Sequence, residues 1–71
     1  MKDDEALVRM SRQIADFFAA YDEQEAVDGI VGHMRGFWAP AMRARLVTIY
    51  QREPQLLHPL VRAAARELAQ A

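Results

Sequence analysis

The chain is 71 residues long, contains no cysteine and carries a formal net charge of −1, with nine basic and ten acidic residues. The missing cysteines exclude disulfides and thiolate metal sites, and the balanced charge lacks the basic excess of a nucleic-acid-binding domain. No apolar run approaches the roughly 20 residues that span a bilayer, and the mostly acidic start of the chain lacks the apolar core of an export signal. We therefore expect a cytoplasmic protein with no membrane and no nucleic-acid partner.

The size of the chain limits what it can bury by itself. We expect a single helical domain over residues 1–71, and a chain of this size buries only about 60% of the surface that it exposes when unfolded. Small domains usually gain stability from disulfides, a metal or association, and the two histidines, His33 and His58, do not have the spacing of a zinc site. Apolar residues nevertheless make up 52% of the chain. This composition favours a protein partner or very close helix packing.

A first helix is predicted from about residue 3 or 4 to residue 20, because apolar residues recur there at intervals of three and four. These residues form one stripe, which we expect to face the core: Leu7, Met10, Ile14, Phe17, Phe18 and Tyr21.

A second helix is predicted from about residue 23 to residue 35. Asp22 followed by Glu25 is typical of a capping box at a helix start. Gly29 and Gly32 lie inside this helix and cost it roughly 1 kcal/mol each relative to alanine. Glycine at such positions indicates that a neighbouring backbone, from the fold or from a partner, comes close. The inner face is expected to consist of Val27, Ile30, Val31 and Met34.

The second helix is expected to end at Gly36 in a left-handed cap, followed by a joint over residues 37–39. Pro40 suits the first position of a third helix, which runs to Arg52. Its inward residues are Met42, Leu46, Ile49 and Tyr50.

Pro54 begins a loop that extends to His58, and Pro59 suits the first position of a fourth helix. Leu60, Val61, Ala64, Leu68 and Leu57 are its expected core residues. Short connections between such helices predict an all-α fold, a compact bundle of about four short helices.

The residues provide no catalytic constellation. Ser11 is the single serine, and no histidine lies at helical spacing from it. Paired carboxylates occur only where helix capping explains them. We therefore expect a chain that is not an enzyme.

The joint between the second and third helices holds the candidate partner-binding residues. Phe37 and Trp38 have the aromatic composition of an interface hot spot, and they would equally suit a core anchor. Arg43 and Arg45 either bind carboxylates or phosphates or belong to a solvated face. His33 either caps its helix or donates a hydrogen bond across an interface. Both interpretations stay open for each residue.

A resemblance to a known family covers nearly the whole chain. The joint contains His33, Phe37-Trp38, Pro40 and Met42-Arg43. It is preceded and followed by Gln13-Ile14-Ala15, Phe17-Phe18, Tyr21, Glu25-Ala26-Val27, Gly29-Ile30 and Pro59-Leu60-Val61. In this order the residues resemble the delta subunit of soluble NAD-dependent formate dehydrogenases. The chain departs from the family's usual residues at Asp22, Ala39 and Ala41.

The resemblance implies a non-catalytic accessory subunit that docks on the catalytic (alpha) subunit and supports its cofactor-loaded, active state. It implies that the bis-molybdopterin guanine dinucleotide lies in that partner, and that this chain alone binds no cofactor. Phe37 and Trp38 would be buried anchors of the contact, Arg43 and Arg45 would pair with partner carboxylates or cofactor phosphates, and His33 would orient the joint. The alternative is a self-contained helical homodimer in which the same aromatic residues form the core.

Overall fold

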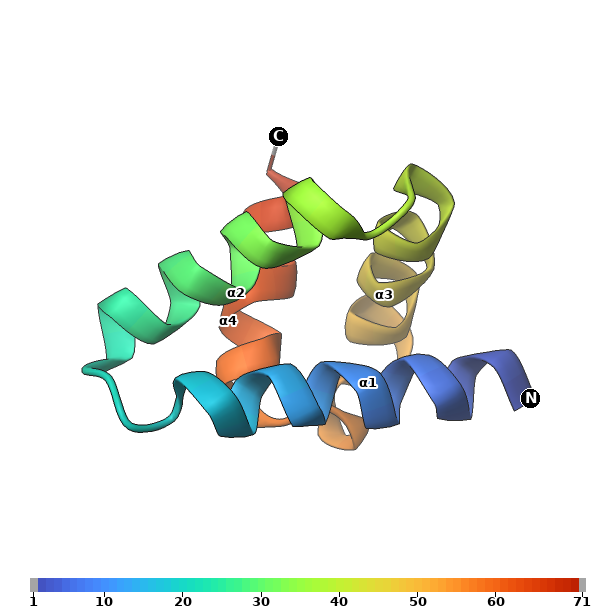
Figure 1. Cartoon of the computed structure of the whole chain (residues 1–71). Coiled ribbons are helices and arrows are strands. Elements are labelled where there is room, and N and C mark those ends of the chain that lie inside the picture. Colours follow the sequence, from blue (N-terminus) through green and yellow to red (C-terminus); the bar gives the residue numbers. More distant parts are fainter. Residues whose placement is uncertain (1, 71) are drawn as a thin grey trace.

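The computed structural model describes residues 2–70 and is all-α, as the sequence predicts (Figure 1). No strand occurs in this part of the chain, and no helix in it is both long and apolar enough to cross a membrane. The elements are α1 (Lys2–Phe18), α2 (Glu23–Phe37), α3 (Pro40–Arg52), the short 3₁₀ helix η1 (Pro54–Leu56) and α4 (Pro59–Ala69).

The four helices form one compact body. Its Cα radius of gyration is 10.8 Å, close to the value of about 11 Å expected for a folded chain of this length. In Figure 1, α1 runs along one side, α2 crosses obliquely above it and α3 stands steeply to both. α4 lies behind and packs against α2 and α3.

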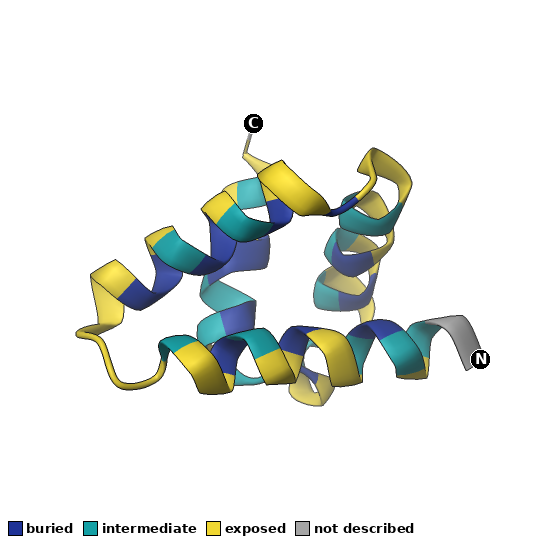
Figure 2. Ribbon diagram, in the orientation of Figure 1, coloured by how far each residue is buried: buried dark blue, intermediate teal, exposed yellow. Residues whose placement is uncertain are grey.

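The core is formed by side chains from all four helices and is lined by small residues. The largest side chains that are fully buried are Ile30, Met34, Leu46 and Val61. Ala15, Ala26, Ala64 and Ala65 are also fully buried, which allows the helix axes to approach closely. The predicted inner faces of α2, α3 and α4 are confirmed, and they follow the dark blue and teal segments of these helices in Figure 2.

The predicted inner stripe of α1 is partly wrong. α1 buries Leu7, Ser11 and Ala15 at intervals of four, whereas Met10 and Phe17 are exposed. The buried row consists largely of small side chains, so that α1 lies close to the core and its larger side chains stand to one flank. Ser11 is fully buried, and its hydroxyl donates a hydrogen bond of 2.8 Å to the Val8 carbonyl, which satisfies its polar group.

The end of α2 also differs from the prediction. Gly36 is not a left-handed cap, since no residue from 2 to 70 has a positive φ. α2 continues through Phe37 and ends at Trp38, which is extended (φ −90°, ψ 139°) and whose N–H donates to the Met34 carbonyl at 2.9 Å. Arg43 satisfies carbonyl groups at this helix end, so no glycine cap is needed.

Two corners of the chain are closed in the same way. At the α2–α3 corner, Arg43 Nη1 donates to the Trp38 carbonyl at 2.7 Å and to the Met34 carbonyl at 3.3 Å. At the η1–α4 corner, Arg62 Nη1 donates to the Leu57 carbonyl at 2.8 Å and to the Pro54 carbonyl at 3.3 Å. Each arginine lies three residues after the proline at the start of its helix, Pro40 for α3 and Pro59 for α4. In each corner the shorter hydrogen bond is accepted by the carbonyl of a buried residue two positions before that proline. We call these the arginine-closed corners.

Candidate functional site

Trp38 belongs to the core of the chain. Only 6% of its surface is exposed, and it packs in the same cluster as Met34 and Leu46. This burial agrees with the interpretation of Trp38 as a core anchor. Its role in partner binding stays a prediction.

Phe37 has the opposite environment, although it is the next residue. It is 80% exposed, the largest exposed fraction among the large apolar side chains from residue 2 to residue 70. Its ring lies 5.0 Å from the half-buried imidazole of His33, one turn earlier on α2, with 33° between the ring planes. His33 and Phe37 thus form a tilted pair of rings on α2, of which Phe37 is the exposed member.

Arg43 and Arg45 point to different places. Arg43 donates to backbone carbonyls at the end of α2, including a longer bond of 3.5 Å to the Arg35 carbonyl. Arg45 forms a 3.1 Å ion pair with Asp4 of α1, and both side chains are more than a third exposed. Such a pair contributes at most about 1 kcal/mol. The five predicted residues therefore do not form one site.

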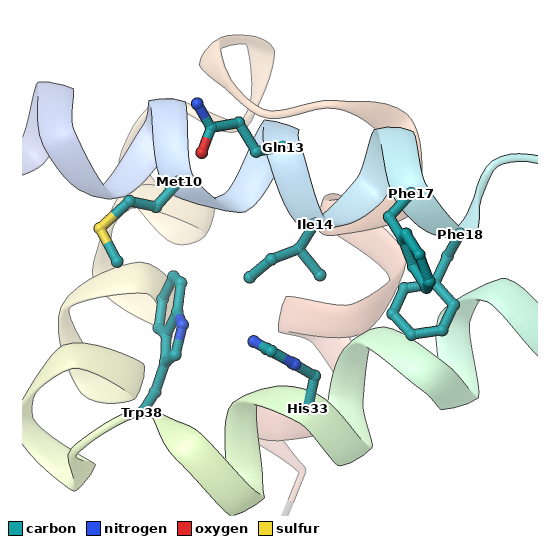
Figure 3. A pocket seen from close by; sticks show the side chains of 7 residues that line it. All are labelled: Met10, Gln13, Ile14, Phe17, Phe18, His33 and Trp38. Carbon is teal, nitrogen blue, oxygen red and sulfur yellow. The ribbon is translucent and has the colours of Figure 1, made fainter.

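An apolar furrow runs between α1 and α2 (Figure 3). Its volume is about 500 Å³. It is lined by Met10, Gln13, Ile14, Phe17, Phe18, His33 and Trp38. None of these side chains is an acid, an arginine or a lysine. We call this feature the α1–α2 furrow.

The two walls of the furrow run in opposite directions. Ile14 of α1 lies opposite His33 of α2, and Met10 approaches the edge of Trp38 at one end (Figure 3). At the other end the Phe18 ring lies directly against Gly29, leaving no room for a Cβ atom there. The close approach predicted at Gly29 is therefore real, although the neighbour is a ring and not a backbone.

Gly32 and Gly36 are four residues apart and therefore share one exposed face of α2. A Cβ atom added at either glycine would meet nothing within 4 Å. The fold of this chain thus provides no reason for glycine at these two positions.

The start of α2 carries two neighbouring carboxyl groups, those of Asp22 and Glu25. The Asp22 carboxylate accepts a 2.9 Å hydrogen bond from the Glu25 backbone N–H, which lowers the pKa of Asp22. The neighbouring Asp22 side chain raises the pKa of Glu25. The Asp22 half of the predicted capping box is therefore present, and its role is to start the helix.

His58 likewise starts a helix, because its Nδ1 accepts a 3.0 Å hydrogen bond from the Leu60 N–H at the start of α4. Residues 2–70 contain no group of three or more side chains arranged to hold a metal ion.

Sequence analysis missed the contribution of α1 to the furrow. Met10, Phe17 and Tyr21 were assigned to the core with the rest of the apolar stripe, but they are 39%, 69% and 51% exposed. The sequence does contain a signal for this arrangement. Ser11 and Ala15 are small residues four positions apart on α1, and small side chains suit a close contact between helices better than large ones do.

Comparison with known proteins gives one match. A family model described as NADH-dependant formate dehydrogenase delta subunit FdsD matches residues 6–65. Among the curated proteins and among the solved structures, the searches found no match. The matched range runs from the first turns of α1 into α4 and includes both walls of the furrow and both arginine-closed corners. The chain therefore belongs to the FdsD family of formate dehydrogenase delta subunits.

Proposed function

We propose that this chain is a non-catalytic subunit that docks on the catalytic (alpha) subunit of a soluble, cytoplasmic, NAD-dependent molybdenum formate dehydrogenase. Its task is to support the cofactor-loaded, active state of that subunit. The observation that carries this proposal is the family match over residues 6–65. The exposed aromatic side chains beside the α1–α2 furrow support a role in protein association, because large exposed apolar patches on small domains mark interaction sites.

In this proposal the bis-molybdopterin guanine dinucleotide is held by the catalytic subunit. The arginines of the present chain do not fit a phosphate-binding role together. Arg43 is engaged by three backbone carbonyls and Arg45 by the Asp4 carboxylate. We therefore assign Arg43 to the corner that positions Trp38, and we assign no cofactor contact to either arginine.

The test is co-expression of the catalytic subunit with and without this chain, with the chain tagged for purification. We expect the tagged chain to recover the catalytic subunit, and we expect the molybdenum content and formate-dependent NAD reduction of the enzyme to fall when the chain is omitted. Adding the purified chain afterwards separates two roles. Recovery of activity without new cofactor indicates stabilisation, and no recovery indicates a role during assembly. Equal molybdenum content and activity with and without the chain would refute the proposal.

The rival function is a self-contained homodimer. In that alternative the aromatic residues of the joint form the core; Trp38 is buried within one chain, whereas Phe37 is 80% exposed. Sedimentation over a dilution series tests this alternative directly. A dimer that persists on dilution, with no catalytic subunit recovered, would favour the homodimer over the proposed subunit.

A further inference from the structure

We infer that the α1–α2 furrow is the docking surface of this chain, and that its occupant is the apolar face of a helix of the catalytic subunit. This inference rests on the proposed function and adds the surface and the kind of segment that binds there. Four observations carry it: the exposed apolar area, the chemistry of the furrow walls, the helical architecture and the glycines of α2.

The exposed apolar area matches one side of a standard heteromeric interface. Phe17, Tyr21 and Phe37 are 69%, 51% and 80% exposed, which is about 400 Å² if a whole aromatic residue presents about 200 Å². A standard interface buries about 800 Å² per partner, and somewhat more than half of that area is apolar. The three aromatic residues alone therefore provide nearly all the apolar area that such an interface needs.

The same area is too small for a permanent homodimer. Interfaces of that kind bury about 1,000 Å² or more per partner and are about 65% apolar. That footprint would take more than a fifth of the total surface of 4677 Å². The area therefore favours a different protein over a second copy as the occupant.

The walls of the furrow select an uncharged face. Its polar lining groups are the amide of Gln13, the imidazole of His33 and the indole N–H of Trp38. A charged side chain placed there would lose its hydration without an ionic partner. The occupant is therefore apolar along the furrow, with room for a hydrogen-bonding group at Gln13 or His33.

The architecture favours a helix as that occupant. No strand is present from residue 2 to residue 70, so this part of the chain offers no sheet edge to an extended segment. The α1 wall from Met10 to Phe17 is two helical turns long, about 10 Å. An amphipathic helix fits such a groove through anchors spaced at i, i+3 or i+4, and i+7.

The glycines of α2 give a partner backbone room to approach. Gly36, three residues after His33 on α2, faces open space, as does Gly32 one turn earlier. Each glycine lowers the stability of α2 by about 1 kcal/mol relative to alanine. Because nothing in the chain itself uses this space, the exposed glycine face is explained by a helix that packs closely over it.

The inference is tested with the purified catalytic subunit and variants of the full chain. Phe17→Ser and Phe37→Ser remove exposed rings at positions where phenylalanine and serine have similar helix propensities. Leu56→Ser is the matched control, because Leu56 is 42% exposed and borders the opposite flank of α1. We expect each phenylalanine variant to raise the Kd about tenfold or more, as loss of a hot-spot residue does, and the control to leave it nearly unchanged. Circular dichroism verifies that all three variants stay folded.

Photo-crosslinking gives an independent location for the contact. A photoreactive amino acid replacing Gln13 lies in the furrow, and one replacing Gln51 lies on the exposed side of α3. We expect the first to crosslink to a helical segment of the catalytic subunit, and the second not to.

The outcomes separate the two proposals. If the wild-type chain binds the catalytic subunit and both phenylalanine variants bind equally well, docking occurs elsewhere, and this inference is overturned while the proposed function stands. If the wild-type chain does not bind the catalytic subunit, both are overturned. If the isolated chain is a dimer that Phe17→Ser and Phe37→Ser convert to monomers, a second copy occupies the furrow and the inference is also overturned.

Discussion

The contact between Phe18 and Gly29 gives a sharp test of the packing between α1 and α2. In the variant Gly29→Ala, the new methyl carbon would lie 2.7 Å from Phe18 Cδ1 and 2.9 Å from Cζ, well inside van der Waals contact. The Phe18 ring cannot turn aside freely, because Phe17 packs against it edge-on at 5.0 Å and Tyr21 lies 5.8 Å away. Gly32→Ala is the matched control, since its methyl group would meet nothing within 4 Å.

Both substitutions gain the same helix propensity, about 1 kcal/mol for alanine over glycine. At Gly32 this gain stands alone, so Gly32→Ala should be stabilising by about that amount. At Gly29 the overlap with Phe18 costs about 1–3 kcal/mol, as overpacking usually does. Gly29→Ala should therefore range from neutral to about 2 kcal/mol destabilising. The difference between the variants, which cancels propensity, should be about 1–3 kcal/mol.

Thermal unfolding followed by circular dichroism measures this difference. For a domain of this size, 1 kcal/mol shifts the Tm by about 4–8 °C, so the two variants should be well separated. In a Phe18→Ala background the overlap is absent, and Gly29→Ala should then be stabilising like Gly32→Ala. Equal Tm shifts for the two glycine variants in the wild-type background would refute the packing argument.

Three further predictions concern the corner and the start of α2. Arg43→Met removes the donor that satisfies partly buried carbonyls, so it should lower the free energy of unfolding in urea by about 1–3 kcal/mol. Arg45→Met breaks an exposed ion pair and should lower it by at most about 1 kcal/mol. Equal losses of stability in the two variants would contradict the role of Arg43 in the corner. Trp38→Ala should destabilise the isolated chain by about 3–5 kcal/mol, visible as a lowered urea midpoint, and unchanged stability would mean that Trp38 is not a core residue. Asp22→Ala should lower the Tm at neutral pH. Because the pKa of Asp22 is lowered in the folded chain, the carboxylate contributes to stability above its ordinary pKa of 3.8, and this contribution is lost as the pH falls through the lowered pKa. The difference in Tm between Asp22→Ala and the wild type should therefore close in acid. A difference that stays constant with pH would contradict this assignment.

The number and order of the helices and the inner faces of α2, α3 and α4 were predicted well, because they depend on local signals. Pro40 and Pro59 both occupy the first position of a helix, and Asp22 accepts a hydrogen bond at the start of α2. These features require only the residue itself and its near neighbours in the chain. The packing of one helix on another requires information that a single helix does not contain.

The candidate site was predicted less well for that reason. Periodicity placed Phe17 and Leu7 in one stripe, but the choice of which flank faces the core depends on how closely α1 approaches the other helices. Similarly, Phe37 and Trp38 are adjacent aromatic residues, and sequence alone did not indicate that one is buried and the other exposed. The sequence did not show which groups Arg43 contacts within the chain, so Arg43 was considered for partner binding. The carbonyls that it satisfies become its neighbours only when α2 and α3 meet at their corner.

The arginine-closed corners have a consequence for the order of folding. Their bonds join residues nine or fewer positions apart, such as Arg43 with Met34 and Arg62 with Pro54. The ion pair that ties α1 to α3 joins residues 41 positions apart. Since contacts between near neighbours close with little loss of chain entropy, we expect the two corners themselves to form early. The furrow needs α1 as one wall, and a partner helix bound there would hold α1 in place and so slow the unfolding of the chain.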